Sequence, residues 1–316
     1  MSPARWRWRE WLSRYGIALA FLVLAAALAL LTPRFLTAAN LLNVLRQISV
    51  NALLAFGMTV VILGAGIDLS VGSVLAFSGA LAAGLSTAGW PAGLAMAAAL
   101  ALGALMGLFN GVFVAWARIA PFIVTLGGLT IFRGATLVYT DGRPITGLPD
   151  AFDALGNGVA LGIPVPVWVM LGFLGLTHFL LRFTALGRAV YAVGGNEEAA
   201  RLSGIPVAAT KLFAYAYAGL ASALGALVLT GRLNSAQPTA GAGYELDAIA
   251  AVVVGGTSLF GGRGGVLGTF VGAAIIGVLN NGMNLLDVSA FYQQIVKGGV
   301  ILGALLIDRM VSARKD

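Results

Sequence analysis

The sequence predicts an all-α integral membrane protein with one transmembrane domain over residues 1–316. Of these residues, 59% are hydrophobic and only 10% are charged, whereas a soluble domain carries roughly 25% charged residues. A helix needs about 20 apolar residues to cross a hydrocarbon core of about 30 Å, and uncharged runs of this order recur along the chain. The composition therefore indicates a polytopic membrane protein without a separate soluble domain.

About ten membrane spans are predicted in order along the chain. The first, at 15–33, follows a basic, tryptophan-rich start and is interpreted as an uncleaved helix that begins in the cytoplasm, because no clear cleavage site follows it. The others are expected at 47–65, 69–88, 92–116, 121–139, 165–182, 211–231, 245–260, 264–285 and 290–308, so that the last three occupy 245–308. Residues 141–166, rich in Gly and Pro, are expected to form a polar loop between spans.

The distribution of Lys and Arg predicts the orientation of these spans. With the N-terminus inside, most basic residues of the loops fall on the inner face, as the positive-inside rule requires. The exceptions on the outer face are Arg34, Arg46, Arg143 and Arg232. The acids assigned to the outer loops are Asp141, Asp150, Asp153, Glu245, Asp247 and Asp287. We therefore expect both termini in the cytoplasm (N-in and C-in). Because the positive charge is spread over membrane loops, nucleic-acid binding is not expected from the net charge of +7.

Asp68 is the only charged residue between Ala52 and Leu85. An ionisable side chain at membrane depth costs roughly 2.5–3.5 kcal/mol on insertion scales, so its presence indicates an interior, a partner or a pathway. Glycines surround it and serines follow it, which predicts a broken membrane helix whose freed backbone groups are bonded by side chains. Two compatible roles stay open: Asp68 caps a helix that begins at Leu69, or it acts directly in transport.

Small residues and chemical motifs complete this description. Gly103, Gly107 and Gly111 recur every four residues in the fourth predicted span, and Gly268 and Gly272 do so in the ninth, a spacing that lets helices approach closely. The chain has no Cys and one His, and the glycine loop at 260–265 lacks the Lys-Ser/Thr pair of a P-loop. We therefore expect no catalytic set, no metal site, no cofactor and no phosphate role for that loop.

The longest predicted inner loop, 182–211, carries the signals of a short helix. Asn196 suits the N-cap, Glu197 and Glu198 suit the positive helix start, and Gly204 followed by Pro206 suits its end. About two turns of helix are too short to be stable alone in water. Packing on the same chain and insertion into a groove of a cytoplasmic partner both stay open, and the charge of the helix favours the partner.

Four segments resemble the permease subunits of bacterial monosaccharide ABC importers. They are VNALLAFGMTVVILGAGIDLSVGSVLA (50–76), the segment 187–205 that ends in AVYAVGGNEEAARLSGI, SAQPTAGAGYELDAIAAVVVGGTSLFGG (235–262) and NNGMNLLDVSAFYQQIVKGGVILGALL (280–306). The resemblance implies a permease in the bacterial inner (plasma) membrane that pairs with a second copy or a close paralogue. It also implies two further partners, an ABC ATPase on the cytoplasmic side and a periplasmic sugar-binding protein.

The resemblance also implies roles for particular residues. In such permeases the loop that matches 187–204 meets the ATPase, so the expected coupling residues are Gly187, Asn196, Glu197, Glu198, Ala199, Ala200, Arg201 and Gly204. Monosaccharides are neutral and rich in hydroxyl groups, which polar side chains can receive loosely. The candidates for the translocation path or the helix break are Asp68, Ser70, Ser73, Asn280, Asn281, Asn284, Gln293 and Gln294.

The expected function is translocation of a monosaccharide, ribose first, by alternating access driven by the separate ATPase. The chain itself is not expected to be an enzyme. Two alternatives stay open. One is an ABC permease for another sugar or a nucleoside, and the other is an ion-coupled secondary transporter in which Asp68 binds the ion or proton.

Overall fold

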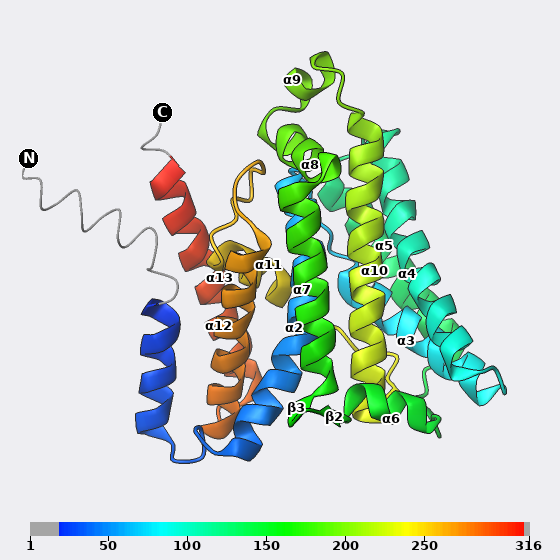
Figure 1. Cartoon of the computed structure of the whole chain (residues 1–316), viewed down its shortest axis with the longest axis vertical. Coiled ribbons are helices and arrows are strands. Elements are labelled where there is room, and N and C mark those ends of the chain that lie inside the picture. The colour runs from blue at the N-terminus through cyan, green and yellow to red at the C-terminus, as the bar shows by residue number, and fades with distance from the viewer. Residues whose placement is uncertain (1–18, 313–316) are drawn as a thin grey trace, which may run out of the picture.

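The computed structural model describes residues 19–312, and these are mostly helical (Figure 1). An apolar helix covers Leu19–Leu31. It is followed by α2 (Ala38–Leu63), α3 (Val71–Thr87), α4 (Ala92–Ala115), α5 (Pro121–Thr140), α6 (Asp150–Gly156), α7 (Val165–Phe183), α8 (Ala185–Gly195), α9 (Glu197–Leu202), α10 (Val207–Leu233), α11 (Tyr244–Val254), α12 (Val266–Leu285) and α13 (Ala290–Ser312). Two antiparallel pairs of very short strands join β1 (Ile145–Thr146) to β4 (Ser235–Ala236) and β2 (Val159–Ala160) to β3 (Ile163–Pro164).

Six helices among the described residues are long and apolar enough to cross a membrane, namely α2, α4, α5, α7, α10 and α12. The Leu19–Leu31 helix and α3 are shorter apolar helices. The prediction of a mostly helical membrane protein is therefore confirmed. Two predicted spans were wrong in extent: α2 starts at Ala38 rather than residue 47, and the span expected at 245–260 contains only the 11-residue α11. Eleven residues give about 16 Å of helix, which is about half of the hydrocarbon core.

Helices α2 and α10 form the centre of the bundle. Most side chains in the second half of α2 and along α10 from Ala214 are buried. Helices α4 and α10 touch at their backbones, because an added Cβ at Gly107 would overlap the Tyr215 carbonyl and one at Gly219 would overlap the Gly103 carbonyl. The predicted close approach through the small residues of α4 is confirmed, and Gly268 and Gly272 of α12 meet α11 in the same way.

The two ends of the bundle differ. Helices α8 and α9 lie at one end, called here the α9 end, and α6 with the strands β2 and β3 lies at the other, the α6 end (Figure 1). The segment expected as a polar loop, 141–166, therefore contains α6 and the β2–β3 hairpin at the α6 end.

Candidate functional site

The short helix predicted in the 182–211 segment is present as α9. The Asn196 side chain caps it by accepting a hydrogen bond from the Ala199 N–H at 2.9 Å. Gly204, with φ of 80°, ends it in the left-handed conformation that glycine adopts without strain. The preceding helix, α8, is capped by Thr184, whose hydroxyl accepts from the Gly187 N–H at 3.1 Å. The residues predicted to start and end α9 therefore do so.

One side of α9 is held by its own chain. Ala200 is buried against Val193 of α8 and Val207 of α10. The Glu197 carboxylate pairs with Arg201 at 2.9 Å and with Lys211 of α10 at 2.6 Å. The chain folds back at Gly204, which brings α9 against α8 and α10. Of the two alternatives left open by the sequence, packing on the same chain is therefore present. The opposite side is free in the described residues, where Leu202 is 81% exposed.

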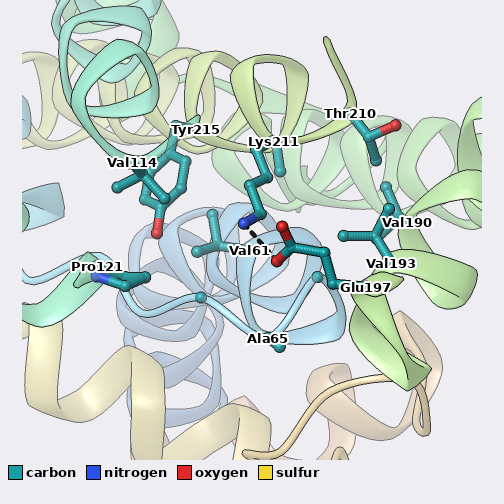
Figure 2. A pocket seen from close by; sticks show the side chains of 13 residues that line it. Val61, Ala65, Val114, Pro121, Val190, Val193, Glu197, Thr210, Lys211 and Tyr215 are labelled. Carbon is teal, nitrogen blue, oxygen red and sulfur yellow. Dashed lines mark hydrogen bonds and ion pairs between the residues drawn. The ribbon is translucent and has the colours of Figure 1, made fainter. Parts of the chain in front are cut away.

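The Glu197–Lys211 pair lies at a small cavity beneath α9 (Figure 2). The cavity has a volume of about 50 Å³ and lies between the end of α2, the end of α4 and the helices α8 and α10. In Figure 2 the Lys211 ammonium points toward the Glu197 carboxylate, with Val61 and Ala65 of the α2 end close by. The hydrogen bond from Lys211 lowers the pKa of the Glu197 carboxyl, so this group is ionised at neutral pH and ties α9 to α10.

Below this cavity the chain breaks between α2 and α3, as the sequence predicted. Asp68 is fully buried there, and its Oδ1 accepts from the Ser70 N–H at 2.8 Å and the Ser70 hydroxyl at 2.6 Å. The Ser70 oxygen in turn accepts from the Asn110 amide of α4 at 2.8 Å. Ser73 donates to the Ser70 carbonyl at 2.8 Å. Asp68, Ser70 and Ser73 are therefore brought together into one polar network.

The form of the predicted cap needs correction. Helix α3 begins at Val71 with Ser70 at its N-cap position, rather than at Leu69. Asp68 thus bonds the residue two positions further on, as in an Asx turn, and orients the segment that leads into the helix. Among the described residues its second oxygen, Oδ2, has no hydrogen-bond partner.

Three segments of the α9 end meet at the carbonyl of Leu63, the last residue of α2. The Gly262 N–H, from the loop between α11 and α12, donates to this carbonyl at 2.9 Å. Gly194 of α8 lies so close that an added Cβ would overlap the same carbonyl. Helix α8, which leads into α9, therefore adjoins the helix break directly, through Gly194 rather than through one of the predicted coupling residues.

A second non-helical segment, not predicted from the sequence, runs through residues 237–243 before α11; it is called here the second broken segment. Gly241 meets Gly72 of α3 backbone to backbone. The Arg133 guanidinium of α5 donates to the Pro238 carbonyl at 2.6 Å, and Glu245 accepts from the Gly243 N–H at 3.2 Å. The glycines in TAGAGY signal this segment, but Glu245 was interpreted as an acid of an outer loop.

The remaining predicted path residues lie apart from Asp68. Asn281 exchanges two hydrogen bonds with Asn40 at the start of α2, at 3.1 and 2.9 Å, and Asn280 is buried beside it in the chain. Gln293 donates to Asn284 at 2.8 Å across the α12–α13 connection, and Gln294 is exposed. The structure therefore divides the predicted set into a network at the break and amides near the α6 end.

One further polar contact falls outside the predicted set. Lys297 of α13 pairs with the buried Asp247 of α11 at 2.9 Å. Within residues 19–312, no group of three or more His, Asp or Glu side chains could hold a metal ion.

The chain is similar over almost its whole length to several bacterial permeases. It matches the family described as "Branched-chain amino acid transport system / permease component" over residues 40–305. It is 52% identical over 301 residues to the ribose import permease protein RbsC of Haemophilus influenzae, covering 94% of this chain and 93% of that one. The RbsC proteins of Bacillus subtilis (53% over 304 residues, 96% and 94% covered) and Escherichia coli K12 (52% over 312 residues, 98% and 97% covered) are equally similar. No solved structure matches the chain.

Proposed function

Because this chain belongs to the family of branched-chain amino acid transport system permease components, we propose that it is the membrane-spanning permease subunit of an ATP-binding-cassette importer for ribose. The observation that carries this proposal is its 52–53% identity, over nearly the full length, to three proteins named as ribose import permeases. The chain acts in the bacterial inner membrane, and a separate subunit hydrolyses the ATP.

The proposed topology has ten crossings, with both termini and the α9 end in the cytoplasm. The Leu19–Leu31 helix, α3, α13 and the broken segment that contains α11 add four crossings to the six long helices. Basic side chains gather at the α9 end, which supports its cytoplasmic location. They are Arg118, Arg182, Arg188, Arg201, Lys211 and Arg263.

The ATPase docks on the exposed side of α9 in this proposal. Beside α9, a groove of about 470 Å³ runs between the first turn of α10 and the end of α4, and Trp116, Arg118 and Arg201 line it. An exposed helix beside a groove is a common way for one protein to engage another. A periplasmic sugar-binding protein delivers the sugar at the α6 end, and a second permease, a copy or a paralogue, completes the membrane core.

Coupling follows from the contacts between α8, α9 and the helix break. A force on α9 reaches α10 through the Glu197–Lys211 pair, and a force on α8 reaches the Leu63 carbonyl through Gly194. The α8 route leads directly into residues 64–70, and α10 reaches the same segment through Tyr215, whose hydroxyl donates to the Ile67 carbonyl at 3.4 Å. The helix is already interrupted there and can bend with little loss of backbone hydrogen bonding. Asp68, Ser70 and Ser73 hold the shape of this break, and the amides of α12 and α13 are the candidates for contact with the sugar.

The test is reconstitution of the permease with the ATPase and the sugar-binding protein in vesicles. We expect ribose uptake that requires ATP and is unaffected by an uncoupler, whereas uptake that an uncoupler abolishes would support the ion-coupled alternative. Competition with other pentoses, hexoses and nucleosides reports the substrate.

Coupling itself is tested by Gly204→Pro and by reversing the charges of Glu197 and Glu198. Proline cannot adopt the positive φ of Gly204. Both changes are expected to leave the permease folded and to lower ATPase stimulation and uptake together. A cysteine placed at the exposed Ala199 should cross-link to the ATPase, and normal transport without any cross-link would contradict the docking role of α9.

A further inference from the structure

A basic groove at the α9 end has no role in the function proposed above. It has a volume of about 660 Å³ and lies between the last turns of α7, the helix α8 and the first turn of α12. Its lining consists of His178, Leu181, Arg182, Arg188, Tyr191, Gly255 and residues 264–268. It shares no residue with the cavity of Figure 2. Figure 1 shows the loop between α11 and α12 rising beside the upper end of α7.

The charge of this groove is uncompensated by the described residues. Arg182 and Arg188 are exposed, and no described carboxylate lies within ion-pair distance of either, in contrast to Arg201 and Lys211, which share Glu197. No carboxylate lines the groove. Two guanidinium groups that face one concave space form a site for an anion with several oxygens, such as a phosphate.

The backbone of α12 adds to this attraction. The helix starts at the groove without a side-chain cap and without an acidic residue in its first turn. The N–H groups of such a first turn carry the positive end of the helix dipole. Gly265 leaves the backbone before this turn open to a ligand, because an added Cβ there would meet only the Tyr191 hydroxyl at 3.7 Å.

The surroundings of the groove indicate which anion reaches it. Arg182 belongs to the last turn of α7, and α12 begins at the opposite wall; both helices are long and apolar enough to cross a membrane. Apolar side chains next to it are exposed: Phe179 on α7, Phe183 at its end, and Leu267 on the first turn of α12. The groove is thus basic at the level where apolar surface ends, which is where lipid phosphates lie.

We propose that this groove binds the phosphate headgroup of an anionic phospholipid. The arginines hold the phosphate, and the apolar surface of Phe179 and Leu267 receives the upper part of an acyl chain. Tyr191, which donates to the Gly264 carbonyl at 2.9 Å, already joins α8 to the α11–α12 loop. A bound headgroup adds a bridge from α7 and α8 to α12 and so fixes the base of the segment that carries α9.

The experiment measures lipid binding to the purified full-length chain in detergent by native mass spectrometry. The probes are phosphatidylglycerol, zwitterionic phosphatidylethanolamine and, in excess, inorganic phosphate. The native chain is expected to retain phosphatidylglycerol in preference to phosphatidylethanolamine. In R182Q/R188Q, affinity for phosphatidylglycerol should fall roughly ten- to thirtyfold, given the known contribution of each basic side chain near an anionic surface.

Matched variants separate this site from net charge. R34Q/R143Q removes the same charge from exposed positions at the α6 end and should change affinity less than about twofold, whereas R182K/R188K keeps the charge and should retain part of the affinity. All variants are compared for gel-filtration profile and thermal unfolding before lipid is added.

Three outcomes would overturn the proposal. The first is equal loss of lipid in R182Q/R188Q and R34Q/R143Q, or no loss in either. The second is competition by inorganic phosphate that depends on the same arginines, which would assign the groove to a free anion. The third is that R182Q/R188Q binds lipid as the native chain does but no longer co-purifies with the ATPase, which would assign the groove to an acidic protein surface.

Discussion

Replacement of Asp68 by Asn and by Leu separates a structural role of this carboxylate from an ionic one. Only Oδ1 of Asp68 accepts hydrogen bonds among the described residues, and both come from Ser70. Asn keeps an acceptor at that position, so both bonds survive in neutral form. Because hydrogen bonds to charged groups contribute about 1.5–3 kcal/mol and neutral ones about 0.5–1.5 kcal/mol, the loss is about 1 kcal/mol for each bond. Part of this loss is offset, since a neutral amide costs less to bury than a carboxylate.

Leu removes both acceptor interactions and leaves the Ser70 N–H and hydroxyl buried without Asp68. Each unsatisfied group costs about 1–3 kcal/mol, or about 2–6 kcal/mol together. This is comparable to a large part of the stability of a whole domain. We therefore expect D68N to remain folded and to keep most of its ATP-driven ribose uptake, and D68L to lose assembly or activity.

The assay combines thermal unfolding of the purified chain with uptake in vesicles, normalised to intact complex. S70A is the control, since it removes one of the two donors; it should destabilise the native chain more than it destabilises D68N. If D68N abolishes uptake as completely as D68L while both complexes stay intact, the hydrogen-bond account is refuted and transport depends on the charge of Asp68.

Three further predictions concern packing, pH and topology. Gly107→Ala should destabilise the chain by about 1–3 kcal/mol, because the methyl group would overlap the Tyr215 carbonyl; Gly127→Ala on α5, where nothing lies within 4 Å, should be neutral or slightly stabilising in the same unfolding assay. The hydrogen bond from Lys211 lowers the pKa of the Glu197 carboxyl from its ordinary value of 4.5. The ion pair therefore stabilises the docking of α9 on α10 at any pH above 4.5, and this stabilisation is lost as the pH falls through the lowered pKa. An environment-sensitive dye on L202C should report release of α9 on acidification, and E197Q should remove that transition. Because the native chain has no cysteine, cysteines at Glu198 and Asp150 should react with an impermeant reagent from opposite sides of the membrane, and labelling of both from one side would contradict the ten-span topology.

The features predicted well from the sequence are those whose signals are local. The break near Asp68 follows from adjacent glycines and serines, and α9 follows from a cap, two acids and a glycine within nine residues. Their surroundings could not be predicted, because these depend on chain segments far away. Asn110 meets Ser70 across forty positions, and Asn40 meets Asn281 across 241.

The second broken segment was not predicted because a glycine-rich stretch can form either an exposed loop or an irregular segment inside a bundle. A glycine-rich stretch with two acids is typical of an exposed loop, and only the contact between Gly241 and Gly72 shows that it lies inside the bundle. Asp247 was placed in an outer loop for the same reason, whereas its pairing with Lys297 leaves it almost fully buried. Irregular backbone of this kind is tolerated at membrane depth only when the protein encloses it.

The central position of α10 has a consequence for biogenesis. Helix α2 leaves the ribosome well over a hundred residues before α10 does, which corresponds to roughly 10 to 30 s at about 5–20 residues per second. During that interval the face of α2 that later contacts Ala218 and Ala221 has no α10 to cover it. Until α10 is inserted, the buried face of α2 must therefore contact lipid or a membrane insertase. Release from the insertase before that point would favour contacts of this face with other membrane proteins over the native contacts with α10.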